Sequence, residues 1–140
     1  MPSRRNFFAV AFTCTTLLGI HIAEAGGILS AEAAYRQAVA GQITLVDIRR
    51  PDEWAATGTP MPAKRLDMRR EDFEVVLSRL TNGNRDAPIA LICAKGVRSS
   101  RLSRRLRESG FTNIIDIPEG MEGSYAGVGY IARGLPLNKN

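Results

Sequence analysis

Apolar residues along the chain fall into two patterns, short continuous runs and longer segments with apolar positions three or four apart. The continuous runs predict buried strands at 43–48 and 88–93, and further strands are expected around 63–66, after Pro60 and Pro62, and at 113–117. The spaced segments predict helices at 31–40, 51–58, 70–80 and 97–109, and the Gly-rich segment 120–134 is expected to form turns and at most one short helix. Strands that alternate with helices predict an α/β fold, a three-layer sandwich whose central, mostly parallel sheet is flanked by helices.

The first 25 residues carry a different pattern. A short basic segment is followed by an apolar run over 7–22 and by Ala23-Glu24-Ala25, the small-x-small form that signal peptidases accept. The run is shorter than the roughly 20 residues that span a bilayer, and no second run follows. We therefore predict a cleaved export signal at 1–25, a domain at 26–140, and no permanent membrane anchor.

The basic segment also contains SRRNFF at 3–8, which resembles the twin-arginine export motif. The alternative is an ordinary secretory signal with a chance arginine pair. Either route predicts a periplasmic protein of a bacterium.

The 140 residues are 44% hydrophobic and 24% charged, which is typical of one globular domain. The formal net charge is +5. Loss of Arg4, Arg5 and Glu24 with the signal changes the 19 basic and 14 acidic side chains to 17 and 13, a net charge of +4. A positive domain is compatible with small anions and with nucleic acid as partners, and the net charge does not choose between them.

Cleavage after Ala25 also removes Cys14 and His21, so that Cys93 is the one cysteine of 26–140 and no histidine is left there. This composition excludes an intrachain disulfide, a Cys/His zinc site and a histidine-activated nucleophile from the domain. We expect neither a metal nor a cofactor. Cys14 as a lipoprotein acceptor is an alternative that its preceding residues Ala-Phe-Thr suit poorly, and we treat Cys14 as removed.

Candidate chemistry is concentrated in one loop. Cys93 ends a predicted central strand and a helix begins at Val97, so the thiol is placed at the sheet edge where α/β proteins bind ligands. The backbone N–H groups of the loop can converge on one point, with Gly96 supplying any positive φ. The helix N-terminus, Lys95 and Arg98 favour a thiolate. We predict a nucleophile that needs no base; the alternative is a buried, inert cysteine.

Three segments of the chain resemble the single-domain rhodanese-like sulfurtransferases, and the resemblance covers residues 30–137. These segments are LVDIRRPDEW at 45–54, CAKGVR at 93–98, and IPEGMEG at 117–123 with GLPL at 134–137. The resemblance implies a rhodanese-like fold with Cys93 as the catalytic residue. It implies a substrate-binding loop made of Ala94, Lys95, Gly96, Val97 and Arg98.

The resemblance further implies the reaction. Cys93 takes the sulfane sulfur of a small anionic donor such as thiosulfate, holds it as a persulfide, and passes it to cyanide or a thiol. Arg98 is expected to anchor the loop or the helix start more than to touch substrate. Asp47 and Arg49 either brace the site or form a structural salt bridge. The chain has GTPMPA at 58–63 where relatives carry GHIPGA, so this connection is expected to differ in shape.

Other functions remain open at this point. Phosphatases and arsenate reductases use a similar loop on the same fold, but with one residue more, which fits a tetrahedral oxyanion. A non-catalytic or carrier module that binds a periplasmic protein partner is a second alternative. The arginines along 98–107 are interpreted as a solvated helix face, and we expect no nucleic acid as partner because aromatic stacking positions are absent.

Overall fold

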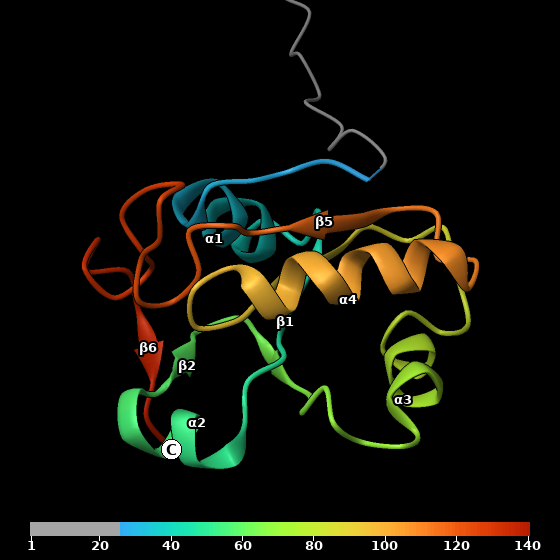
Figure 1. Ribbon diagram of the computed structural model, residues 1–140, viewed down its shortest axis with the longest axis horizontal. Coiled ribbons are helices and arrows are strands. Elements are labelled where there is room, and N and C mark those ends of the chain that lie inside the picture. Colours follow the sequence, from blue (N-terminus) through green and yellow to red (C-terminus); the bar gives the residue numbers. More distant parts are fainter. Residues whose placement is uncertain (1–25) are drawn as a thin grey trace, which may run out of the picture.

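The computed structural model describes residues 26–140, so the predicted export signal, including its twin-arginine-like motif and Cys14, lies outside the described residues. The predicted central sheet is present as four parallel strands in the order β3-β1-β4-β5 (Figure 1). These strands are β1 at Thr44–Asp47, β3 at Lys64–Arg65, β4 at Ile89–Ile92 and β5 at Ile114–Asp116. All residues of β4 are buried, as its continuous apolar run predicted, and so are those of β5, whereas both residues of β3 are exposed.

Helices flank the sheet and complete the predicted three-layer α/β sandwich. They are α1 at Ala31–Val39, α2 at Pro51–Thr57, α3 at Phe73–Leu80 and α4 at Val97–Glu108. Successive residues of β4 point to opposite faces, so Leu91 packs with α3 and α4 while Ile92 packs with α1. Each face of the sheet is therefore covered by its own hydrophobic cluster. The polar loops follow the ends of the strands.

The helix boundaries follow local signals. Ser30 caps α1, because its Oγ accepts a hydrogen bond from the Ala33 N–H at 3.1 Å. Pro51 occupies the first position of α2. The helix predicted from residue 70 begins only at Phe73, because the Arg70 N–H bonds the Asp67 carbonyl in a turn and the following residues continue that turn. Within residues 26–140, no helix combines the length and the apolar character needed to cross a membrane.

The C-terminal region forms the expected turns and, after them, a strand that was not predicted. The segment 120–134 forms turns without a helix, and the chain then runs into β6 at Leu137–Asn138. This strand pairs antiparallel with β2 at Thr59–Pro60 in a separate two-stranded sheet (Figure 1). Neither strand was predicted, because each has only two residues and depends on a partner far away in the sequence.

Candidate functional site

The sulfur of Cys93 lies directly beyond β4, where two backbone amides reach it. Its Sγ accepts hydrogen bonds from the Gly96 N–H at 3.2 Å and from the Ser99 N–H at 3.4 Å. The residue is 1% exposed and packs in the same cluster as α3 and α4. Cys93 is therefore buried, yet its sulfur faces main-chain donors that can stabilise a negative charge.

Ser99 is a residue of this site that the sequence analysis missed. Its buried Oγ accepts a hydrogen bond from the Cys93 thiol at 3.5 Å and donates one to the Gly96 carbonyl at 3.1 Å. The signal that could have found it is its place in the first turn of α4, because the first N–H groups of a helix have no partner within the helix.

Gly96 gives the loop its shape. Its φ is +81°, a left-handed conformation, and a Cβ added there would lie 2.1 Å from the Pro118 carbonyl oxygen. From the other side, the Met121 N–H donates to the Cys93 carbonyl and the Glu122 N–H to the Ala94 carbonyl, both at 2.9 Å. The loop carbonyls are thereby bonded to the segment after β5, so the loop amides stay turned toward the sulfur.

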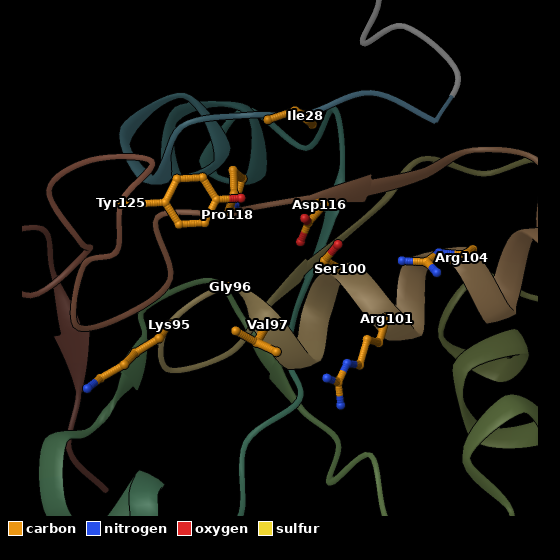
Figure 2. A pocket seen from close by; sticks show the side chains of 10 residues that line it. All are labelled: Ile28, Lys95, Gly96, Val97, Ser100, Arg101, Arg104, Asp116, Pro118 and Tyr125. Atoms are coloured by element: carbon orange, nitrogen blue, oxygen red, sulfur yellow. The ribbon is translucent and has the colours of Figure 1, made fainter.

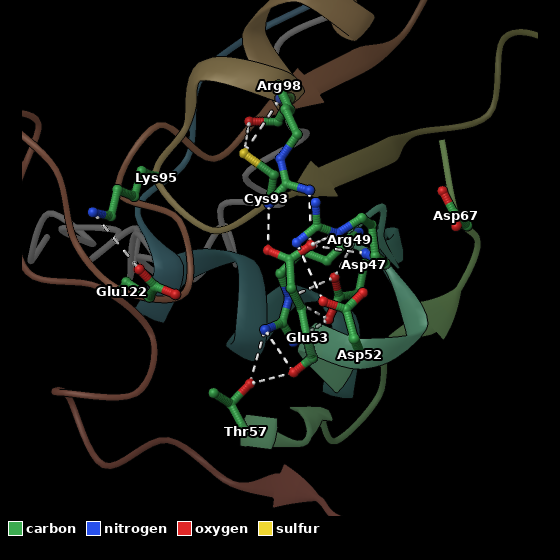
Figure 3. Close-up of polar contacts among 12 residues, drawn as sticks. Asp47, Arg49, Asp52, Glu53, Thr57, Asp67, Cys93, Lys95, Arg98 and Glu122 are labelled. Carbon is green, nitrogen blue, oxygen red and sulfur yellow. Dashed lines mark hydrogen bonds and ion pairs between the residues drawn. The ribbon is translucent and has the colours of Figure 1, made fainter. Parts of the chain in front are cut away.

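Arg98 is turned toward α2. Its guanidinium donates two hydrogen bonds to the Glu53 carboxylate, at 2.8 and 2.5 Å (Figure 3). Glu53 also accepts the Arg50 N–H at 3.0 Å, which fixes it at the start of α2. The hydrogen bond with Arg98, ahead of the other causes, lowers the pKa of Glu53 to about 2, and the same bond raises the pKa of Arg98. Glu53 was quoted in the motif at 45–54 but was not predicted as a site residue.

Asp47 and Arg49 form a buried salt bridge, with Nη2 and Oδ2 2.7 Å apart. Arg49 also donates to Thr57 Oγ1 at 2.8 Å and to the Gly58 carbonyl at 2.7 Å. These contacts connect the end of β1 with the end of α2 (Figure 3), and so they hold the helix that carries Glu53. In the described residues the pair contacts α2 and the residue after it, and it forms no hydrogen bond with the loop at 93–98.

The remaining loop side chains point outward. Lys95 is 69% exposed, and its Nζ lies 3.9 Å from a carboxylate oxygen of Glu122 (Figure 3). Val97 is 56% exposed. The Ala94 carbonyl accepts the hydrogen bond from the Glu122 N–H that joins the loop to the segment after β5. In the part of the chain that the structure describes, no three side chains of His, Cys, Asp or Glu are grouped so that they could hold a metal ion.

Comparisons with known proteins agree with this geometry. The family model described as the rhodanese-like domain matches residues 30–126. A protein of Rickettsia rickettsii described as "Uncharacterized protein RP600 homolog" is 29% identical over 98 residues, which cover 66% of this chain and 80% of that protein.

Two solved structures are similar to the chain. The polysulfide-sulfur transferase homodimer from Wolinella succinogenes superposes with a TM-score of 0.61 and 29% identity, covering 79% of this chain and 77% of that one. The crystal structure of Rv0390 from M. tuberculosis has a TM-score of 0.62 and 23% identity, covering 81% and 98%. The second likeness concerns the fold alone.

Proposed function

Because the chain belongs to the rhodanese-like domain family, we propose that it is a sulfurtransferase that carries a sulfane sulfur on Cys93. The donor is a small anion such as thiosulfate, and the acceptor is cyanide or a thiol. The observation that carries the proposal is the pair of backbone N–H groups, from Gly96 and Ser99, on a buried Cys93 sulfur. The likeness to a polysulfide-sulfur transferase supports the same chemistry.

The reaction runs in two displacements. The Cys93 thiolate attacks the outer sulfur of thiosulfate, the S–S bond of the donor breaks, and sulfite leaves with the electron pair. The product is a Cys93 persulfide. An acceptor thiolate or cyanide then attacks the outer sulfur, and the Cys93 thiolate leaves. No external oxidant or reductant is consumed, and no proton has to be removed by a histidine.

The main-chain donors have a defined role in this scheme. They face the Cys93 Sγ, which carries the negative charge before the first displacement and again after the second, and the hydrogen bonds of the loop carbonyls already orient them. The exposed Lys95 contributes positive potential near the loop mouth, which attracts an anionic donor. Arg98 contributes by fixing the loop to Glu53 and does not need to touch the donor.

The test is persulfide formation, read by intact mass. Incubation of the full chain with thiosulfate is expected to add about 32 Da, one sulfur atom, and cyanide is expected to remove it again. Cys93→Ser, checked for folding by circular dichroism, is expected to stay unmodified. Absence of the addition from the unaltered protein, with thiosulfate and with polysulfide, would overturn the proposal.

The same assay distinguishes the alternatives. A carrier module that depends on a protein partner would acquire the sulfur only when a second protein supplies it. A phosphatase or an arsenate reductase would act on its oxyanion without gaining a sulfur. The loop, with four residues between Cys93 and Arg98, favours the sulfur-sized species.

The proposed place of action is the bacterial periplasm. Its support is the sequence of residues 1–25, with a basic start, an apolar run and a small-x-small end. The twin-arginine-like motif at 3–8 extends the proposal to an export route for folded proteins. A thiol acceptor or a protein partner would then also belong to that compartment.

A further inference from the structure

A hollow of about 320 Å³ lies beside the loop of Cys93, and loop residues form part of its wall (Figure 2). Lys95, Gly96 and Val97 line it together with the first turns of α4 and the segment after β5. Gly96 is also the residue whose N–H bonds the Cys93 sulfur, at 3.2 Å. A molecule seated here therefore contacts the loop that holds the sulfur. We call this surface the loop-side face, defined by Ile28, Lys95, Val97, Arg101, Arg104 and Tyr125.

Three large apolar side chains of the loop-side face are open to solvent. Ile28, Val97 and Tyr125 are 71%, 56% and 100% exposed. They come from separate parts of the chain, namely the segment before α1, the start of α4 and the segment after β5, and all three line the same hollow (Figure 2). Exposed apolar side chains that gather at one place are typical of surfaces that bind another molecule.

Tyr125 is presented by a turn that hydrogen bonds hold in shape. The backbones of Ser124 and Gly127 exchange two hydrogen bonds of 3.1 Å. The Ser124 Oγ accepts the Ala126 N–H at 3.0 Å and donates to the Pro118 carbonyl at 2.7 Å. An aromatic side chain on such a preorganised backbone loses little conformational entropy on binding, and tyrosines of this kind often anchor protein interfaces.

The charge of the loop-side face is mainly positive. Arg101 and Arg104 are exposed and form no ion pair with any residue of 26–140. Lys95 adds a third positive charge, which Glu122 offsets in part from 3.9 Å away. The acidic residue in the wall, Asp116, is only 7% exposed and presents little negative charge to solvent. A partner that complements this face is acidic.

We propose that the loop-side face docks an acidic segment of a partner protein whose cysteine receives sulfur from Cys93. The acidic side chains of the segment pair with Arg101 and Arg104, and its apolar side chains cover Tyr125 and the apolar residues around it. The partner's thiolate attacks the outer sulfur of the Cys93 persulfide, the bond between the two sulfurs breaks, and the Cys93 thiolate leaves. The product is a persulfide on the partner. The proposal rests on the proposed sulfur transfer and assigns its acceptor to the class of protein thiols.

A protein segment suits this face better than a nucleic acid does. Binding of single-stranded nucleic acid relies on cations that follow the backbone and on several aromatic side chains that stack on the bases. Tyr125 is the one aromatic residue among the described residues that line the hollow, and its apolar neighbours there, Ile28 and Val97, are aliphatic. A nucleic acid also offers no thiol to the persulfide. The combination favours a peptide with acidic and apolar side chains.

Peptide binding tests the docking without any sulfur transfer. The probe is a capped, fluorescently labelled peptide, Glu-Asp-Leu-Ser-Ile-Glu-Asp, and its basic counterpart has Lys-Arg in place of each Glu-Asp. Anisotropy with the full chain at low ionic strength is expected to show saturable binding of the acidic peptide, at least about tenfold tighter than that of the basic one. Absence of saturation up to about 0.5 mM protein, or equal affinities, would overturn the proposal. A single-stranded oligothymidylate that binds as tightly as the acidic peptide would overturn it as well.

Two double variants locate the charged contacts. Arg101→Gln with Arg104→Gln is expected to weaken binding of the acidic peptide at least about fivefold, because two opposite-charge contacts are lost. Lys64→Gln with Arg79→Gln is the matched control, since it removes the same charge from exposed positions on β3 and α3. We expect the control to change the affinity by less than about twofold. Equal losses in both double variants would mean that net charge alone governs binding, and the docking surface would be disproved.

The apolar anchor is tested by Tyr125→Ser. We expect the acidic peptide to bind about fivefold more weakly, because its apolar side chains lose their aromatic contact. Val39→Ser, at a residue of α1 that is 61% exposed, is the control and is expected to leave the affinity within about twofold. Both replaced side chains are exposed, so the core stays intact, and thermal unfolding of each variant verifies this. Unchanged affinity in Tyr125→Ser contradicts the proposal.

Discharge of the Cys93 persulfide connects the docking with sulfur transfer. The same peptides, with Cys in place of Ser, are added to the loaded full chain, and the loss of about 32 Da is followed by intact mass. Per thiolate, the acidic peptide is expected to react at least about tenfold faster than the basic one, with a smaller ratio at high salt. If Cys93 acquires no sulfur, the proposed function fails, while the peptide affinities still decide on the docking. If cyanide removes the sulfur and both peptides remove it equally fast, the docking proposal alone fails.

Discussion

Glu53 shows how one side chain can hold two elements together. Its carboxylate accepts hydrogen bonds from Arg98 at the end of the loop and from the backbone of Arg50 at the start of α2. A residue with both contacts is more sensitive to replacement than an exposed acid of the same helix, because a lost partner leaves Arg98 with an uncompensated, partly buried charge.

We expect Glu53→Gln to lower the free energy of unfolding by about 1–2 kcal/mol near neutral pH. This loss is smaller than that for a fully buried ion pair, because water reaches part of the Glu53–Arg98 pair. The folded pKa of Glu53 is about 2, below its ordinary value of 4.5, so the stability it contributes is complete above the higher value and is lost as the pH falls toward the lower one. The difference in free energy of unfolding between Glu53→Gln and the unaltered protein is therefore expected to shrink as the pH falls from 4.5 to about 2.

Urea unfolding at several pH values measures this difference. Asp52→Asn is the control, because Asp52 is in the same turn of α2 but is 69% exposed and contacts Arg50 at 3.2 Å. Its replacement is expected to change stability by less than about 0.5 kcal/mol. A constant difference for Glu53→Gln from neutral to acid pH would contradict the assigned role of the carboxylate.

At the scale of elements, the loop depends on close contact between two backbones. Gly96 and Gly83 have nearly equal φ values, +81° and +80°, but a Cβ would clash only at Gly96. Around Gly83 no atom lies within 4 Å of the added Cβ. The two glycines thus separate the cost of the left-handed conformation from the cost of the clash with Pro118.

We expect Gly83→Ala to lower the free energy of unfolding by about 1 kcal/mol, from backbone strain alone. Gly96→Ala is expected to cost about 2–4 kcal/mol more and to reduce the yield of Cys93 persulfide, because Pro118 or the loop has to move. Denaturant unfolding and intact mass measure the two effects. Equal stability losses for the two variants would show that the loop is not confined by the segment after β5.

The elements themselves were largely predictable from the sequence. Apolar runs identified β1, β4 and β5 of the parallel sheet, and Ser30 and Pro51 marked helix starts, because both signals are local. The β2–β6 pair and the Arg98–Glu53 contact were not predicted. Each joins residues that are distant in the chain, so it depends on how the layers pack, which hydrophobic spacing does not encode.

At the scale of the whole molecule, the N-terminal segment of the described residues is part of the sheet edge. The Leu29 N–H donates to the Asp116 carbonyl at 3.0 Å, and the Asp116 N–H donates to the Gly27 carbonyl at 3.1 Å. A chain that starts at Gly26 keeps both bonds, whereas a chain that starts after Ser30 loses them and leaves the β5 edge uncovered.

We expect the exported protein to start at Gly26, because Ala23 and Ala25 suit signal peptidase and because this start preserves the edge contacts. The intact mass of the protein in a periplasmic fraction measures the start. Replacement of Arg4 and Arg5 by lysine is expected to block export if the twin-arginine route is used. Recovery of the chain with residues 1–25 still attached would contradict cleavage.

A chain that starts at Gly26 has one sulfhydryl group, on Cys93. A persulfide on Cys93 then has no neighbour in the same molecule that could resolve it into a disulfide. Each discharge requires an encounter with an outside nucleophile, so its rate rises in proportion to the acceptor concentration. In a compartment poor in free thiols, the loaded form would accumulate, and the lifetime of the bound sulfur would report how much acceptor is present.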